Sequence, residues 1–114
     1  MSTSLQAQTV SPLERRLGRV IVPKVEFKET SLDSTLDFMA QIPVKTHQME
    51  TAVNMVKAYK TANPELGDVK ITLSLSNVPW TELLRYICLA ANVQYRYEAF
   101  AVFIEAPKPP PKQQ

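Results

Sequence analysis

The sequence predicts an α+β fold with two βαβ-like halves, two main helices packed on small mixed β-sheets, and a closing C-terminal β-hairpin. The main observation is a repeated pattern, in which an apolar strand is followed by a polar break and a short amphipathic helix. The pattern begins at Val20 and again at Val69. A doubled strand–helix–strand unit is typical of a small α/β module. Neither copy contains residues that indicate catalytic chemistry.

Length and composition limit the classes of function. A chain of 114 residues supports one domain, and its 45% hydrophobic content is enough to form a core. The 13 basic and 11 acidic residues leave a net charge of +2, which is too balanced to indicate binding to nucleic acid or to a membrane surface. No apolar run approaches the roughly 20 residues of a membrane span. We therefore expect no nucleic-acid partner and no direct membrane insertion.

Capping and breaking residues predict the first elements. Ser11 caps a short helix that has Pro12 at its first position and Gly18 at its end. A strand follows over residues 19–27. Within it, Pro23 indicates an edge position or a bulge, because proline cannot donate to a β-ladder.

The next helix is capped by Thr30 or Ser31, and Pro43 is expected to end it. Its apolar residues recur at helical spacing, with acidic residues between them. We expect Leu32, Leu36 and Met39 to face the core, and Asp33 and Asp37 to face water.

Residues 45–60 allow two interpretations. A helix would place the apolar residues of this segment on one stripe, whereas the alternation over residues 53–59 fits a strand. Periodicity alone does not decide between them. The helical stripe would hold Met49, Ala52, Val53, Val56 and Tyr59, and the strand would hold Val53, Met55 and Lys57 on one face.

The second half is more regular. A turn is predicted over residues 63–68, and residues 69–75 alternate between apolar and polar side chains, as a half-buried strand does. Pro79 opens the second main helix and Asn92 ends it, with Trp80 as a core anchor. Helical spacing places Trp80, Leu84, Ile87 and Ala91 on one face, with Leu83 and Cys88 on its flanks.

The chain closes with a predicted hairpin of strands 94–98 and 101–105. Ala99 and Phe100 form its turn, although a looser four-residue loop is an alternative, because the Asn-Gly chemistry of a tight hairpin is missing. With the tighter turn, one face is directed to the core and holds Tyr95, Tyr97, Val102 and Ile104. The outward face then holds Arg96, Glu98, Phe103 and Glu105.

Several of these stretches follow one another in an order that is found in a known family of domains. The series consists of the alternating strand 69–75, the step Asn77-Val78-Pro79, a leucine-rich helix ending in a small turn, and the closing hairpin. This series resembles the secretin and TonB-dependent receptor short N-terminal domain, and residues 25–38 are similar to the first strand and helix of that family. The likeness is closest to versions in secretin-like proteins of planctomycete and verrucomicrobial type. It favours a strand over residues 54–59, and it departs from the family at residues 42–51, which are longer and more polar than the usual turn.

The resemblance implies a domain division and a role. Residues 1–18 would be an N-terminal extension with a short helix, residues 19–106 the domain resembling this family, and residues 107–114 a Pro-rich linker or tail. The implied function is non-enzymatic protein recognition in envelope secretion, pilus or transport machinery, without a cofactor. The partners would be envelope proteins or neighbouring subunits, including weak association of the chain with itself. The alternatives are a free-standing cytoplasmic binding module with an unrelated protein partner and, less favoured, an RNA-binding βαβ domain.

The expected location depends on whether the chain is an excised piece. An excised domain of this family would be periplasmic or associated with the outer membrane. Residues 1–10 lack the basic start and apolar run of a secretory signal, so the chain taken as complete is expected to be cytoplasmic.

The residues that most often carry chemistry are sparse. His47 is the only histidine and Cys88 the only cysteine, and the two are too distant in sequence to suggest a metal site. We expect His47 to be a solvated loop residue and Cys88 a small core residue. Gly18 and Gly67 are isolated and form no phosphate-binding loop. We therefore expect no catalytic residue, metal or cofactor.

The candidate binding residues lie on the hairpin. Phe103 is predicted on the outward face and Phe100 at the tip, with Arg96 and Glu98 beside them. Exposed aromatic residues of this kind suit a groove on a protein partner. The alternative is a hairpin phase shifted by one residue, which would pack Phe103 under a helix. An RNA-binding sheet would need Tyr95 and Tyr97 on its open face, whereas the alternation places both toward the core.

Overall fold

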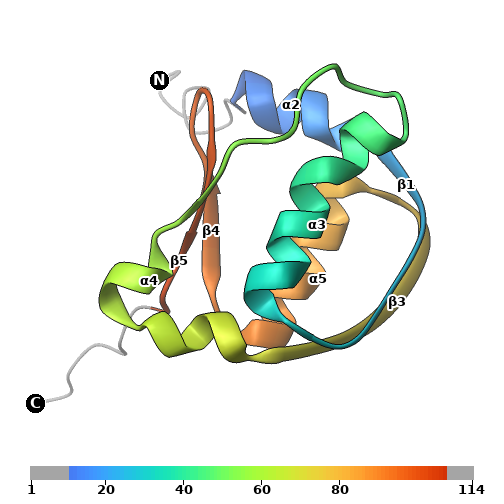
Figure 1. Ribbon diagram of the computed structural model, residues 1–114. Coiled ribbons are helices and arrows are strands. Elements are labelled where there is room, and N and C mark those ends of the chain that lie inside the picture. Colours follow the sequence, from blue (N-terminus) through green and yellow to red (C-terminus); the bar gives the residue numbers. More distant parts are fainter. Residues whose placement is uncertain (1–10, 108–114) are drawn as a thin grey trace, which may run out of the picture.

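The computed structural model describes residues 11–107 and confirms the α+β class. Helices α3 and α5 lie between a two-stranded sheet, β1–β3, and a three-stranded sheet, β2–β5–β4 (Figure 1). The elements in chain order are α2 (Pro12–Gly18), β1 (Ile21–Ser31), α3 (Leu32–Lys45), β2 (Met55–Lys57), α4 (Tyr59–Ala62), the 3₁₀ helix η1 (Pro64–Asp68), β3 (Lys70–Pro79), α5 (Trp80–Ala91), β4 (Gln94–Tyr97) and β5 (Val102–Glu105).

The first strands of the two halves, β1 and β3, form a curved antiparallel ribbon beside the helices (Figure 1). Both strands are longer than the sequence predicts, because their pairing continues from Ile21 opposite Pro79 to Ser31 opposite Lys70. The register shifts between Phe27 and Thr30, where Glu29 adopts a left-handed φ of 48° and its N–H donates to Thr72 Oγ1 at 3.0 Å. A bulge of this kind bends a strand and increases its twist.

Proline Pro23 lies in β1, one of only two strands in this sheet, and is exposed. The edge position predicted for it is therefore confirmed, while the bulge lies further along the strand, near Glu29.

The second sheet is mixed. Strand β2 pairs in parallel with β5, and β4 pairs with β5 in antiparallel fashion. In the hairpin Tyr97 lies opposite Val102, and the Glu98 N–H donates to the Ala101 carbonyl at 2.8 Å. The turn centred on Ala99 and Phe100, and the register that it sets, are confirmed.

Helix α3 continues through Pro43, so the prediction that this proline ends the helix is wrong. Proline lacks the N–H that would bond to the carbonyl of Met39, four residues earlier. That carbonyl instead accepts a hydrogen bond of 2.9 Å from the buried indole Nε1–H of Trp80. The helix end is then completed by His47 in a left-handed conformation (φ 61°), with the Gln48 N–H donating to the Pro43 carbonyl at 2.8 Å.

Residues 45–60, for which the sequence allows either a helix or a strand, contain both kinds of structure. Residues Met55–Lys57 form strand β2, which confirms the strand favoured by the resemblance for that part, but Tyr59 begins the short helix α4. The predicted turn that follows contains the 3₁₀ helix η1. The preceding loop is attached to β1 by the Gln48 amide, which accepts from the Ile21 N–H and donates to the Ile21 carbonyl, both at 2.8 Å.

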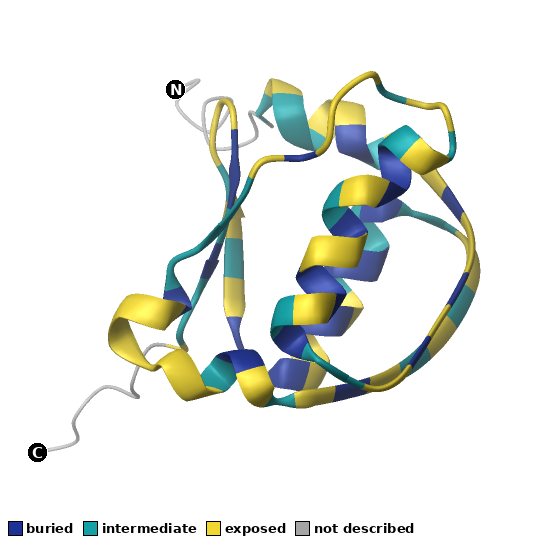
Figure 2. Cartoon of the chain, viewed as in Figure 1, coloured by how far each residue is buried: buried dark blue, intermediate teal, exposed yellow. Residues whose placement is uncertain are grey.

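One hydrophobic core joins the elements, and Figure 2 shows the buried stripes of α3 and α5 in dark blue. Helix α5 begins after Pro79 and ends at Asn92, whose φ of 57° is the left-handed conformation of a helix terminus. Leu17 of α2 belongs to the same core, so this helix packs with residues 19–106. All of the core residues predicted for the two main helices are buried, namely Leu32, Leu36, Met39, Trp80, Leu83, Leu84, Ile87, Cys88 and Ala91.

The predictions for residues 1–10 and for most of the Pro-rich tail, residues 108–114, lie outside the described residues.

Candidate partner-binding site

The candidate site lies on the hairpin of β4 and β5, whose inner face packs on the core. Val102 and Ile104 are fully buried on the inner face. Tyr95 and Tyr97 lie half-buried on the same face, with their rings edge-to-face at 5.8 Å between centroids. Both tyrosine rings are thus directed toward the core, as the alternation predicts, and neither is displayed as an open stacking platform.

On the outer face, Arg96 connects three of its neighbours. Its guanidinium lies over the ring of Phe103, 4.5 Å from the centroid. Its Nε donates to Glu105 Oε2 at 3.0 Å, and its Nη1 forms an ion pair with Glu98. A cation–π contact at an exposed site contributes about 0.5–1 kcal/mol, and exposed ion pairs contribute about 0–1 kcal/mol each. These contacts orient the side chains on the outer face and contribute little to the stability of the fold.

Phe100 stands at the tip of the hairpin and is 88% exposed, the most exposed of the large hydrophobic residues in the described part of the chain. It lines a shallow hollow of about 430 Å³ together with the other three predicted binding residues, Arg96, Glu98 and Phe103. We call these four residues the hairpin surface. The structure therefore brings the four predicted residues together, with Phe103 half-buried on the sheet and not under a helix.

A second groove, of about 340 Å³, is also bordered by Phe100. We call it the tip groove, because the hairpin tip forms one wall while α2 and the loop before β2 form the others. Its lining includes Leu13, Arg16, Met49, Ala52 and Val53. No local pattern in the sequence predicts this groove, because residues 1–18 are expected to be an extension outside the domain and residues 45–60 allow both a helix and a strand.

Val56 of β2 was also missed as a member of the outer face. It is in parallel register with Phe103 of β5 and is half-buried. Its place could not be predicted while residues 45–60 remained open between helix and strand.

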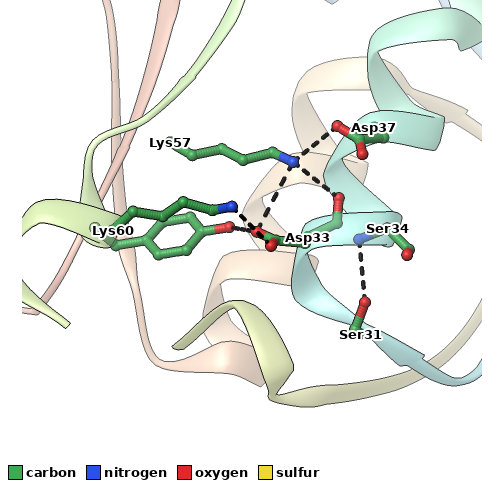
Figure 3. A network of polar contacts seen from close by, with 7 residues as sticks. Ser31, Asp33, Ser34, Asp37, Lys57 and Lys60 are labelled. Carbon is green, nitrogen blue, oxygen red and sulfur yellow. Dashed lines mark hydrogen bonds and ion pairs between the residues drawn. The ribbon is translucent and has the colours of Figure 1, made fainter. Parts of the chain in front are cut away.

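A different polar cluster connects α3 to the β2–α4 segment (Figure 3). Lys57 Nζ lies 2.8 Å from Asp37 Oδ1 and 3.8 Å from Asp33 Oδ1. Lys60 Nζ lies 3.0 Å from Asp33 Oδ2, and the Tyr59 hydroxyl donates a hydrogen bond to Asp33. The expectation that both aspartates face water is wrong for Asp33, whose side chain is only 32% exposed, while Asp37 is 72% exposed.

The electrostatics of this cluster indicate a structural role. Burial raises the pKa of Asp33, but the hydrogen bonds from Tyr59 and Lys60 and the charges of Lys57 and Lys60 outweigh it, so the net pKa is lowered. Burial, and then the hydrogen bond to Asp33, raise the pKa of Tyr59. A carboxylate with a lowered pKa, whose oxygens are engaged by the Tyr59 hydroxyl and the Lys60 ammonium, is a weak base. The cluster therefore stabilises the packing of β2 and α4 against α3.

The remaining reactive residues lie where they were expected. His47 is exposed in the loop after α3, and Cys88 is buried in α5, where burial raises the pKa of its thiol to about 12. Within residues 11–107, no group of three or more His, Cys, Asp and Glu side chains has an arrangement that could hold a metal ion.

Comparison of the chain with family models, with curated proteins and with solved structures gave no match. None of the helices in the described part of the chain has the length and apolar content needed to cross a bilayer.

Proposed function

We propose that this chain is a non-enzymatic protein-interaction module that docks a protein partner through its hairpin surface. The observation that carries this proposal is the 88% exposure of Phe100 beside Phe103, on a hairpin whose inner face is committed to the core. Aromatic residues placed at the centre of a patch, with charged residues at its rim, are typical of binding hot spots. Here Arg96 and Glu98 supply that rim.

The resemblance of residues 19–106 to the secretin and TonB-dependent receptor short N-terminal domain supports a role in the cell envelope. On that basis the module acts on the periplasmic side, in secretion, pilus or transport machinery, and docks envelope proteins or neighbouring subunits. The balanced charge of +2 fits protein recognition better than binding to nucleic acid.

The proposal is tested by photo-crosslinking in the native host. A photoreactive benzoylphenylalanine replaces Phe100 in one variant and Leu89 in a control variant. Leu89 is a matched control, because it is 66% exposed, lies on α5 and does not line the hollow of the hairpin surface. We expect discrete crosslinked protein products from position 100 and none from position 89. Equal labelling from both positions, or none from position 100, would overturn the proposal.

A further inference from the structure

We propose that the tip groove receives Phe100 of a second copy of this chain, so that two copies form a two-fold symmetric pair. This inference rests on the proposed function, because it names one occupant of the same surface. In a two-fold interface each copy presents the same patch, which must therefore be complementary to itself. Both the shape and the charge of the patch meet this requirement.

The shape complementarity comes from a protruding ring next to a hollow. Phe100 projects from the hairpin tip and also borders the tip groove, whose apolar wall includes Leu13, Met49 and Val53. The groove volume of about 340 Å³ is more than twice that of a cavity of about 150 Å³, which is enough to hold a benzene ring. When the ring of one copy enters the groove of the other, the symmetry places the second ring in the first groove.

The charge complementarity comes from one residue in each of the two hollows that Phe100 borders. Arg16 of α2 lines the tip groove, and within the described residues it forms no ion pair. Glu98 lines the hollow of the hairpin surface, and its ion-pair partner within residues 11–107 is Arg96. A Phe100 ring that enters the partner groove brings its own Glu98 toward the partner's Arg16. Two such ion pairs form in one symmetric dimer.

The affinity of such a pair is low. Stable interfaces bury about 1,200–2,000 Å² in total, whereas the two Phe100 rings of the pair, at about 150–250 Å² each, contribute about 300–500 Å² of buried area. Self-association is therefore expected at high micromolar concentration, and the ion pairs make it weaker as salt increases.

The test is sedimentation velocity over about 10–500 µM with charge-reversal variants. Arg16→Glu (R16E) and Glu98→Arg (E98R) each place like charges opposite one another in a homodimer, so each variant alone is expected to remain monomeric. An equimolar mixture of R16E and E98R is expected to associate at least as well as the wild type, because both contacts become attractive again. Arg15→Glu is the matched control, because Arg15 lies on the same short helix but does not line the groove. This control is expected to associate like the wild type.

The outcomes separate this inference from the proposed function. Association that is lost in the two single variants and regained in their mixture supports the symmetric pair. A wild-type monomer over the whole range overturns it, as does a mixture that stays monomeric while the wild type associates. If crosslinking from position 100 then captures a different protein, the proposed function stands and the second copy is excluded as the occupant.

Discussion

The indole Nε1–H of Trp80 donates a 2.9 Å hydrogen bond to the carbonyl of Met39, joining the start of α5 to the middle of α3. Pro43 leaves this carbonyl without its helical donor, since proline has no N–H. Trp80 supplies the missing donor from the other half of the fold, and the side chain is fully buried. The two main helices are thus connected by a polar bond as well as by apolar packing.

Because Trp80 and Pro43 both affect the hydrogen bonding of the Met39 carbonyl, a double-mutant cycle of these two residues is informative. Trp80→Phe removes the donor and leaves a buried carbonyl unpaired, which costs about 1–3 kcal/mol in addition to the lost packing. Pro43→Ala restores a backbone N–H at the position that can reach Met39. We expect the loss of unfolding free energy caused by Trp80→Phe to be smaller in the Pro43→Ala background, as measured by urea denaturation. Strictly additive effects would show that the two donors do not share one acceptor.

Stability should depend on pH through Asp33. Its folded pKa is lowered relative to the ordinary aspartate value of about 3.9, so the unfolded state binds the proton more readily. The stabilising contribution is therefore present above the unfolded pKa and is lost as the pH falls through the folded pKa. We expect Asp33→Asn to reduce the unfolding free energy by about 1.5–3 kcal/mol near neutral pH, the range for hydrogen bonds to a charged group.

The measurement is urea denaturation near neutral pH and at a pH below the folded pKa of Asp33. The difference between the wild type and Asp33→Asn should shrink at the lower pH, because the wild-type carboxylate is then protonated. Asp37→Asn is the control, because Asp37 is mostly exposed and an exposed ion pair contributes about 0–1 kcal/mol. A difference for Asp33→Asn that stays constant with pH would contradict the assigned role of its charge.

The two glycines should respond in opposite ways to alanine. A Cβ added at Gly67 would lie 2.7 Å from Asp33 Oδ2, so Gly67→Ala must displace the carboxylate that Tyr59 and Lys60 hold. At Gly18 the nearest atom to an added Cβ is 4.0 Å away, and the residue ends helix α2. We expect Gly67→Ala to lower the melting temperature, and Gly18→Ala to leave it unchanged or raise it, since alanine gains about 0.4–1 kcal/mol where its conformation fits. A neutral Gly67→Ala would show that Asp33 moves without cost.

The sequence predicted those parts of the fold that local patterns determine. The alternation at residues 94–98 and 101–105 identified the correct hairpin faces, and Asn92 was correctly expected to end α5. The failures arose from partners distant in sequence. Pro43 does not end α3 because Trp80 satisfies the freed carbonyl, and Asp33 is shielded by Tyr59, which lies 26 residues further along the chain.

The candidate site likewise has one part that local sequence patterns predict and one part that they do not. The hairpin surface was predicted as a set because its members are neighbours on one hairpin, where strand alternation determines the side-chain directions. The tip groove was missed because it forms only when α2 and the loop before β2 meet the hairpin tip. Those contacts depend on the packing of Leu17 into the core, and the sequence of residues 11–18 does not identify the elements that Leu17 contacts.

The central claim is that a protein, here a second copy of the chain, docks at the hairpin tip around Phe100 and not on another apolar part of the molecule. Amide chemical shifts measured by NMR at low and at high protein concentration test it without assuming where docking occurs. We expect the concentration-dependent shifts to cluster at Arg16, Glu98 and Phe100. The other exposed apolar residues, Ile21, Phe38 and Leu89, should keep their shifts and serve as internal controls. Shifts confined to Ile21 and Phe38 would contradict the account, because they would place the docking surface on the β1 and α3 side of the molecule.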